Sequence, residues 1–264
     1  MTVQRVRLDT LLAERGLFSS RARAAASVLA GEVRLGPGRE RAAKPGQMVA
    51  SDVDVSVDEA PRYVSRGGIK LANALDALEL DVRGRRALDA GASTGGFTDA
   101  LLQRDAEHVI AVDVAYGELD WGLRNDERVT VLERTNARAL APQDLPYAPD
   151  LLVADLSFIS LRKVLPALLA CMAPRFDALV MVKPQFEVGR ERVGGGVVRD
   201  PADRRWALVA VAEAARGLGA CVLGFASSGL PGPKGNRETF AWLAEGGREG
   251  AVGDVEAAAR EVEP

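Results

Sequence analysis

Cysteine, histidine and aromatic residues are scarce in this chain of 264 residues. Its only two cysteines, Cys171 and Cys221, lie in apolar stretches, which favours buried thiols and excludes a disulfide framework or a cysteine-based zinc motif. The only histidine, His108, stands where a strand is expected to begin, so we expect it to be structural. No metal site is expected, and any catalysis is left to other side chains.

Long apolar runs are also missing. No stretch approaches the roughly 18 apolar residues of a membrane-spanning helix, and the N-terminal stretch MTVQRVRLDT lacks the apolar segment of a signal peptide. These absences predict a soluble, cytoplasmic protein that has no membrane partner. They leave the oligomeric state open, with a monomer favoured.

Charge is distributed unevenly along the chain, although the formal net charge is only −3. Residues 1–50 carry nine Lys/Arg against four Asp/Glu, whereas residues 245–264 carry two Arg against six acids. A basic module on a mildly acidic body indicates a polyanionic partner that binds one end of the molecule. From charge alone, an unevenly charged solvated surface stays open as the alternative.

The N-terminal part is predicted to form a small unit of two short helices and short strands. Gly16 ends the first helical pattern, RLDTLLAERG, whereas Ser20 begins and Gly31 ends the second, SSRARAAASVLAGEV. Short strands are expected at 32–35 and 53–57. We therefore divide the chain into a domain at 1–59, a linker at 60–66, a larger domain at 67–246 and an acidic tail at 247–264.

From residue 67 onward, helical and strand patterns alternate. Continuous apolar strands with helices between them predict a parallel sheet covered on both faces, and hence an α/β fold. The stretch RETFAWLA at 237–244 fits either a closing strand or a helix, and the tail fits either a frayed helix or disorder. The expected helix lies over 68–80, and the expected strands lie near 86–90, 108–113, 129–133, 150–154, 178–182 and 220–226.

The stretch LDAGASTGGFTDALL, residues 88–102, predicts a strand, a tight turn and a helix, which is typical of a cofactor-binding turn. It departs from the dinucleotide pattern G-x-G-x-x-G, because Ser93 stands where the second glycine would admit a pyrophosphate. Asp89, just before the turn, would repel a pyrophosphate but suits a cation or an amine.

S-adenosylmethionine fits this turn better than a dinucleotide, since it carries a sulfonium, an amino group and a ribose but no phosphate. Asp113, 24 residues after Asp89, can bind the ribose hydroxyls. A dinucleotide site, or a turn that only joins strand to helix, stays open as the alternative.

Four ionisable residues stand at the ends of predicted elements: Lys70, Asp155, Lys183 and Glu238. Asp155 and Lys183 follow parallel strands, at the edge where open α/β sheets bind ligands. A lysine accepts a proton only when its amine is neutral, and a second ammonium with partial desolvation favours that form. The set therefore suits removal of a proton from a ribose 2′-hydroxyl, with Lys183 as the candidate base and Lys70 and Asp155 positioning it. Taken singly, each residue also fits a surface ion pair, so the hypothesis depends on their joint placement.

Five stretches, LDAGASTGGFTDALL, VLERTNAR, ADLSFISL, VKPQFEVG and SRGGIKL, together resemble the TlyA family, and the resemblance extends over residues 5–245. It implies a Rossmann-like, class I S-adenosylmethionine-dependent methyltransferase domain of the FtsJ/RrmJ type, after a small α+β, S4-like RNA-binding domain. It also implies Lys70, Asp155, Lys183 and Glu238 as the catalytic set. The methyl-donor contacts that it implies are Gly91, Ser93, Thr94, Gly95, Gly96, Phe97, Asp113 and Asn136.

The same resemblance implies methylation of cytidine 2′-hydroxyls in ribosomal RNA, on both subunits in longer members and on the large subunit in shorter ones. The basic N-terminus and the tail beyond residue 245 resemble the longer members, so 16S and 23S rRNA within ribosomal subunits are the expected substrates. Eight cations of the N-terminal module can contact phosphates without reading sequence. They are Arg5, Arg7, Arg21, Arg23, Arg34, Arg39, Arg41 and Lys44.

The stretch FEVGRERVGGGVVRDP, residues 186–201, is rich in glycine and arginine. It fits a mobile loop over the active site or an ordinary flexible surface loop. Two other functions also stay open for the whole chain. One is a ribosome-assembly factor that binds RNA and keeps a vestigial methyltransferase fold; the other is a membrane-lytic protein, suggested by the haemolysin label of many TlyA members. The lack of a spanning segment or of a cationic amphipathic helix argues against lysis.

Overall fold

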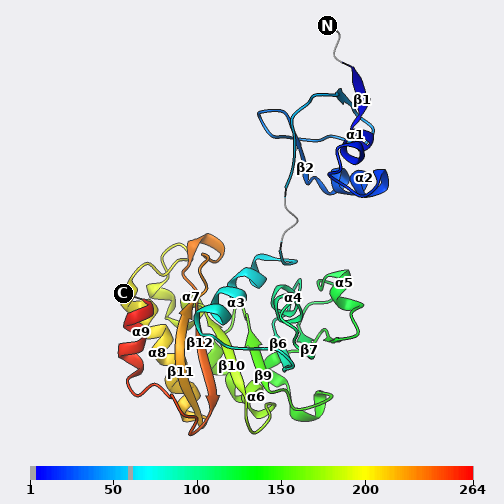
Figure 1. Ribbon diagram of the computed structural model, residues 1–264. Coiled ribbons are helices and arrows are strands. Elements are labelled where there is room, and N and C mark those ends of the chain that lie inside the picture. Colours follow the sequence, from blue (N-terminus) through cyan, green and yellow to red (C-terminus); the bar gives the residue numbers. More distant parts are fainter. Residues whose placement is uncertain (1–3, 59–61, 264) are drawn as a thin grey trace. The chain divides into compact units, whose positions relative to one another are not determined.

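The computed structural model describes residues 4–58 and 62–263, and the chain divides into two compact units, Met1–Arg62 and Tyr63–Pro264 (Figure 1). The linker expected at 60–66 falls partly on residues 59–61, which lie outside the described residues. Residues 63–66 belong to the larger unit. Within the described ranges, no helix is long and apolar enough to cross a membrane.

The smaller unit packs two helices and short antiparallel strands around a small apolar core that includes Leu8, Leu12 and Val28. As predicted, the Ser20 hydroxyl caps the second helix by accepting a hydrogen bond from the backbone N–H of Arg23, and Gly31 ends that helix with a φ of 80°. Strand β1 pairs with β4, and β2 lies between β3 and β5. The elements are β1 (Arg5–Arg7), α1 (Leu8–Glu14), α2 (Arg21–Ala30), β2 (Val33–Leu35), β3 (Glu40–Arg41), β4 (Met48–Ala50) and β5 (Val55–Val57).

The larger unit is built on a seven-stranded sheet with the order β11-β12-β10-β9-β6-β7-β8. Strands β6 to β10 run parallel, whereas β12 is antiparallel to both of its neighbours, β10 and β11. The expected α/β fold is confirmed, and the stretch 237–244, left open between strand and helix, forms the strand β12. The strands are β6 (Arg86–Ala90), β7 (His108–Val112), β8 (Val129–Leu132), β9 (Leu151–Ala154), β10 (Asp177–Val182), β11 (Ala220–Ser227) and β12 (Thr239–Glu245).

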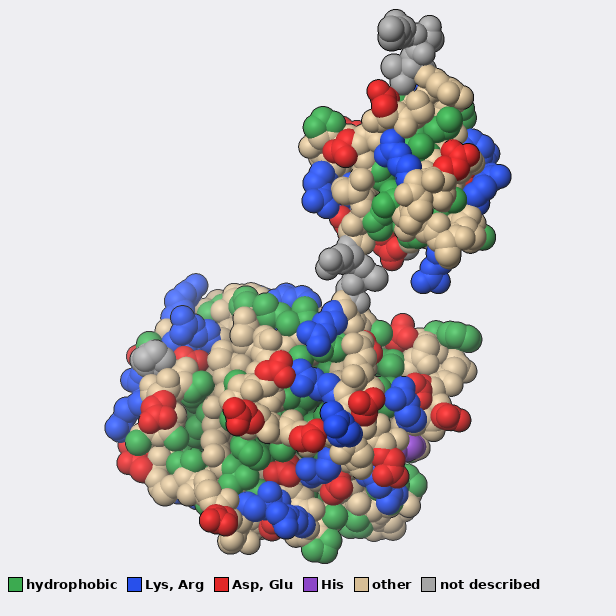
Figure 2. Space-filling model, viewed as in Figure 1, with side chains coloured by type: hydrophobic (Ala, Val, Ile, Leu, Met, Phe, Trp, Pro, Cys, Tyr) green, Lys and Arg blue, Asp and Glu red, His purple; other side chains and the backbone are tan. Residues whose placement is uncertain are grey.

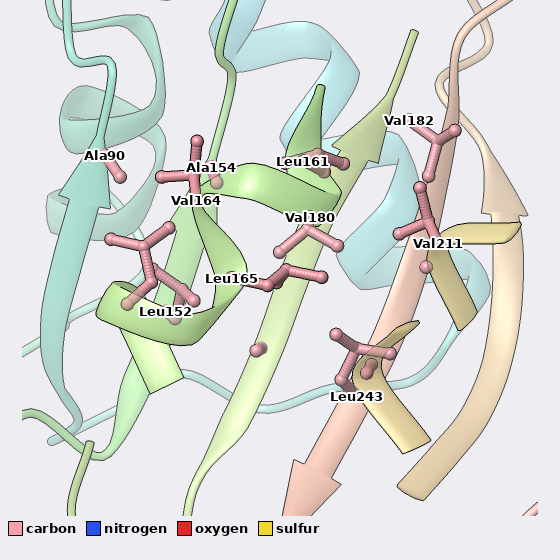
Figure 3. Close-up of a cluster of buried hydrophobic side chains, with 14 of the residues drawn as sticks. Ala90, Leu152, Ala154, Leu161, Val164, Leu165, Val180, Val182, Val211 and Leu243 are labelled. Atoms are coloured by element: carbon pink, nitrogen blue, oxygen red, sulfur yellow. The ribbon is translucent and has the colours of Figure 1, made fainter. Parts of the chain in front are cut away.

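Helices cover both faces of this sheet, which explains why both faces of its central strands are mostly apolar. Leu152 and Ala154 of β9 face one buried cluster, whereas Leu151 and Val153 face the other, as the alternation of side chains along a strand requires. Figure 3 shows the first cluster, in which Leu165 packs over strands β9 and β10. The helices are α3 (Arg66–Ala77), α4 (Gly96–Leu102), α5 (Trp121–Arg124), α6 (Leu165–Ala170), α7 (Pro184–Glu187), α8 (Pro201–Gly217) and α9 (Val255–Val262).

In the segment 247–264, for which the sequence left a frayed helix or a disordered acidic tail open, residues Val255–Val262 form the helix α9. Its apolar residues Val255 and Ala259 are one turn apart on a single face and are buried against α8. Asp254 caps the helix by accepting a hydrogen bond from the backbone N–H of Ala257. A short amphipathic pattern is thus stabilised here by tertiary packing. Of the two cysteines, Cys171 is buried as expected, whereas Cys221 is only half-buried; both are free thiols.

Helices α3 and α4 begin side by side, which brings the segment SRGGIKL against the glycine-rich turn. A Cβ on Gly96 would lie 2.9 Å from the backbone nitrogen of Gly68 and 3.2 Å from Cα of Gly67. Only a residue without a side chain allows this approach. This packing of α3 against α4 places Lys70, one turn further along α3, at the edge of the sheet.

We predict that Gly96→Ala destabilises the larger unit by about 1–3 kcal/mol, since the new methyl group has to push the two helix starts apart. Gly217→Ala is the matched control, because a Cβ there meets open space at an exposed end of α8. The control is expected to be neutral or slightly stabilising, and urea denaturation measures both changes. Equal stability of the two variants would contradict the close approach.

Candidate active site

The site lies at the edge of the sheet where the parallel strands end. Gly91 follows β6, Asp155 follows β9 and Lys183 follows β10, and these three strands are neighbours. Strand β12 runs in the opposite direction and therefore begins at this edge, directly after Glu238. Sheet order alone thus assembles residues that are up to 147 positions apart in the chain.

Two adjoining cavities open at this edge. The larger one, of about 350 Å³, is lined by the turn residues Gly91 and Ser93 together with Asp113, Glu118, Asn136 and Phe158, among others. The smaller one, of about 200 Å³, is lined by both active-site lysines and the start of α4. The two cavities share Gly91, Ser93, Asp155 and Ser157, so a group held in one lies next to a group held in the other.

The glycine-rich turn has a backbone that side chains would obstruct. Gly91 has a φ of 88°, and a Cβ there would lie 2.7 Å from the backbone oxygen of Asp155. Gly95 has a φ of 95°, and a Cβ there would lie 2.4 Å from Cδ1 of Leu123. Both positions require glycine because L-residues with side chains rarely adopt a left-handed conformation.

Three carboxylates, from Asp113, Glu118 and Asp155, and one cation, Arg138, line the larger cavity. Both oxygens of the Asp113 carboxylate accept backbone hydrogen bonds, at 2.7 Å from Ser93 and at 2.8 Å from Ala115, which fixes the side chain. The exposed Glu118 lies beside it and accepts a hydrogen bond from the Ser93 hydroxyl at 3.3 Å. Asn136 begins a short helix, where its side-chain oxygen accepts a hydrogen bond from the backbone N–H of Arg138 at 3.0 Å. Acidic oxygens at this place suit hydroxyl donors and cationic groups.

The residues predicted to bind the cofactor are divided between the two cavities, and two of them line neither. Gly91 and Ser93 line both cavities, and Asp113 and Asn136 line the larger one. Gly95 and Asp89 are not among the lining residues of either cavity. The remaining members line the smaller cavity: Thr94, Gly96 and Phe97.

Asp89 lies beneath the turn rather than in it. Its carboxylate is fully buried and accepts a hydrogen bond from the Thr98 hydroxyl at 2.7 Å, while Oδ1 finds no hydrogen-bond partner among the residues that the structure describes. Burial, together with the negative charges of Asp155 and Asp113, raises the pKa of Asp89 to about 7. The folded protein therefore keeps a proton on Asp89 at pH values where an ordinary aspartate has lost it.

Two ammonium groups in the smaller cavity are each paired with a carboxylate. Lys183 Nζ lies 2.5 Å from Asp155 Oδ1 and donates a hydrogen bond to the Ser157 hydroxyl at 2.8 Å. Lys70 Nζ forms an ion pair with Glu238. Asp155 keeps 25% of its side chain exposed, whereas the Glu238 side chain is fully buried. All four predicted ionisable residues therefore meet at this site as two ion pairs.

Two further residues were not predicted from the sequence. Ser157 lines both cavities and binds Lys183, and its only sequence signal is its position two residues after Asp155. The buried Glu187 accepts hydrogen bonds from the Ser160 hydroxyl at 2.6 Å and from the backbone N–H of Leu161 at 2.7 Å. Glu187 thereby holds the loop after β9 against the segment after β10.

The cations of the smaller unit are mostly exposed and partly paired. Arg7 and Arg21 contact Asp9, and Arg34 and Arg39 contact Asp58. A hydrogen bond from Arg7 lowers the pKa of Asp9 to about 2. Figure 2 shows blue and red side chains interspersed on the visible face of this unit. Arg5 donates to the backbone oxygen of Met48, and Arg23, Arg41 and Lys44 are exposed.

Within the described residues, no group of three or more His, Cys, Asp or Glu side chains is arranged to hold a metal ion. His108 lies at the start of β7, at the opposite edge of the sheet from the cavities, and its Nδ1 is 2.7 Å from the Tyr147 hydroxyl.

Comparison with known proteins identifies the chemistry that such a site performs elsewhere. The FtsJ-like methyltransferase family matches residues 63–245. The 16S/23S rRNA (cytidine-2′-O)-methyltransferase TlyA of Mycobacterium tuberculosis is 52% identical over 243 residues, which cover 91% of this chain and 90% of that protein. The 23S rRNA (cytidine-2′-O)-methyltransferase TlyA of Campylobacter jejuni is 33% identical over 180 residues, which cover 67% of this chain and 69% of that protein.

A solved structure agrees over nearly the whole length. A protein of Streptococcus thermophilus, described as a candidate hemolysin, superposes with a TM-score of 0.72 at 37% identity and covers 98% of this chain and 96% of its own.

The raised pKa of Asp89 predicts a pH-dependent stability. Between its ordinary pKa of 3.8 and about 7, the folded state holds a proton on Asp89 that the unfolded state has released. The contribution of Asp89 to stability therefore falls as pH rises through this window, by up to about 1.4 kcal/mol per pH unit, and is constant above it.

The Asp89→Asn variant lacks this proton equilibrium. We expect its stability relative to the natural protein to improve as pH rises from 5 to about 7 and to level off at higher pH. Urea denaturation of both proteins at four pH values measures the difference. A difference that is independent of pH would show that Asp89 titrates normally in the folded state.

Proposed function

Since the chain belongs to the FtsJ-like methyltransferase family and, within it, to the TlyA proteins, we propose that it methylates cytidine 2′-hydroxyls of 16S and 23S rRNA with S-adenosylmethionine. One observation carries this proposal. A cavity lined by acidic residues and the glycine-rich turn adjoins a second cavity, which holds two lysine–carboxylate pairs. Both cavities are lined by Asp155 and Ser157.

The larger cavity fits the methyl donor. Its volume of about 350 Å³ lies within the usual range for small-ligand pockets. Asp113 and Glu118 offer acceptors to ribose hydroxyls, and Asn136 offers an amide to the adenine. When bound, S-adenosylmethionine supplies an electrophilic methyl group on a sulfonium. The lining holds three carboxylates, from Asp113, Glu118 and Asp155, against one cation, Arg138, so its charge favours a sulfonium and an amine over a pyrophosphate.

The smaller cavity fits the acceptor nucleotide. Lys183 is the candidate base for the proton of the 2′-hydroxyl, and Asp155 and Ser157 hold its Nζ at the junction of the cavities. Orientation of the hydroxyl by these groups supplies much of the rate, because effective concentrations in oriented sites are very high.

The smaller unit is proposed to be an S4-like RNA-binding domain. Exposed ion pairs such as Arg39–Asp58 contribute little to stability, so their arginines can exchange a carboxylate for a phosphate at low cost. Such contacts position structured RNA, and the target cytidine is expected to flip out of its stack into the smaller cavity. A ribosomal substrate places the enzyme in the cytoplasm.

We predict that Lys183→Ala lowers methyl transfer by at least about a hundredfold, since the base is lost. Binding of S-adenosylmethionine, measured by calorimetry, is expected to stay close to that of the natural protein. Lys163→Ala is the control, because Lys163 is exposed and lies outside both cavities. Normal turnover by Lys183→Ala would refute the assignment of the base.

The substrate range is tested with labelled S-adenosylmethionine and separated 30S and 50S subunits that lack the modification. We expect label on ribose in both subunits, identified by digestion of the RNA. Label in the large subunit alone would restrict the substrate to 23S rRNA and still support the methyltransferase assignment. No label, with S-adenosylmethionine still bound, would favour an assembly factor, and leakage of liposomes caused by the pure protein would favour lysis.

If the smaller unit binds RNA phosphates, mutation of its cations should weaken RNA binding and reduce the salt dependence of the affinity. Replacing both Arg23 and Lys44 by Ala should weaken binding to ribosomal subunits and reduce the slope of log affinity against log salt by about 2, as expected for two lost phosphate contacts. The affinity for S-adenosylmethionine should not change. An unchanged slope would place the RNA contacts elsewhere.

A further inference from the structure

The glycine-rich loop, defined here as residues 189–199, is bound to α8 at both of its ends. Arg192 forms an ion pair with Asp203 at 3.1 Å and stacks over the ring of Trp206. At the other end, Arg204 Nη1 donates to the backbone oxygen of Arg199 at 2.7 Å. The sequence suggested a mobile loop or an ordinary flexible one, and the structure gives this loop specific contacts to α8.

The same loop is also bound to the segment that leads into β12. The buried Asn236 donates to the backbone oxygen of Gly196 at 2.8 Å and accepts from the backbone N–H of Val198 at 3.0 Å. Asn236 precedes Glu238, the partner of Lys70, by two residues. In Figure 1 the yellow loop after α7, the orange segment before β12 and the red helix α9 lie together.

One carboxylate at the end of α9 contacts both α8 and the start of β12. Glu263 follows α9 and is buried, and it accepts a hydrogen bond at 2.9 Å from Arg204 Nε, whose side chain is only 8% exposed. It also accepts a hydrogen bond from the Thr239 hydroxyl at 3.4 Å and lies 3.8 Å from Arg237 Nη1. The residues on both sides of Glu238 therefore contact Glu263.

We propose that Glu263 is a positioning residue for methyl transfer. Acting through Arg204, it holds the glycine-rich loop and the start of β12 in the arrangement that keeps Glu238 against Lys70. The physical reason is that a buried guanidinium without a neutralising charge is strongly disfavoured. If the charge of Glu263 is lost, Arg204 has to turn toward solvent and release the backbone oxygens of the loop. This inference rests on the proposed methyltransferase function.

The test compares Glu263→Gln, which keeps the shape and removes the charge, with Glu261→Gln at an exposed position two residues away. Three quantities are measured: the Kd for S-adenosylmethionine, kcat and KM on ribosomal subunits, and the rate of tryptic cleavage after Arg190, Arg192 and Arg199. For Glu263→Gln we expect a Kd within about twofold of the natural protein, a kcat lower by about tenfold or more, and faster cleavage in the loop. Glu261→Gln should match the natural protein in all three.

Two results would overturn the proposal. One is a normal kcat with normal cleavage in Glu263→Gln; the other is a loss of cofactor affinity and kcat in equal proportion, which indicates general destabilisation. If Glu263→Gln does not fold, Arg204→Gln decides, since it removes the guanidinium through which Glu263 is proposed to act. A folded Arg204→Gln variant with reduced kcat and faster loop cleavage supports the proposal, and one with unchanged kcat refutes it. If the natural protein transfers no methyl group, the proposed function fails, while the cleavage rates still report on the loop.

Discussion

The pairing of β10 with β12 is the interaction on which the two lysine–carboxylate pairs of the smaller cavity depend. Val182 is opposite Thr239 in this antiparallel register, so the residues just beyond them, Lys183 and Glu238, meet at the edge of the sheet. One of these residues follows its strand and the other precedes its strand, which is possible only because β12 runs against its neighbours. A slip of one residue would turn every side chain of β12 to the opposite face and remove Glu238 from Lys70. The glycine-rich loop and Glu263 are bound to this same start of β12, so three segments distant in sequence support one register.

The parallel half of the sheet imposes a second constraint, because it presses the glycine-rich turn against Asp155. Ala90 is opposite Ala154, and beyond them Gly91 lies so close to the backbone of Asp155 that no Cβ fits. A similarly close backbone approach occurs where Gly96 packs against the start of α3. Glycine therefore lets residues of both strand ends, Gly91 and Asp155, line both cavities. Such proximity suits a direct transfer between a donor and an acceptor, in which orientation supplies much of the rate.

The sequence was most informative where a single strand end determined the position of a residue. Apolar runs located β6, β9 and β10 to within a residue or two, and with them Asp155 and Lys183. The sequence was least informative where contacts between residues far apart in the chain determine the local structure. The pattern of 237–244 left β12 open, α9 is too short to be stable without α8, and the pairing of Arg34 with Asp58 joins residues that no local pattern relates. Asp89 was placed in the cofactor site because of its nearness to the turn. Alternation along β6, which sends Leu88 and Ala90 to one face and Asp89 to the other, was the available signal that it lies beneath the turn.

The unequal exposure of the two ion pairs distinguishes the roles of the two lysines. Two ammonium groups within one small cavity require nearby carboxylates, since an unpaired buried charge is strongly disfavoured. The carboxylate of the Lys70 pair is sealed from solvent, whereas that of the Lys183 pair is 25% exposed and lines both cavities. A substrate hydroxyl can therefore reach the Lys183 pair and exchange with the Ser157 hydroxyl, which already accepts a hydrogen bond from Lys183 Nζ. The Lys70–Glu238 pair stays intact during this exchange. We infer that Lys70 contributes electrostatically, whereas Lys183 accepts the proton of the substrate hydroxyl.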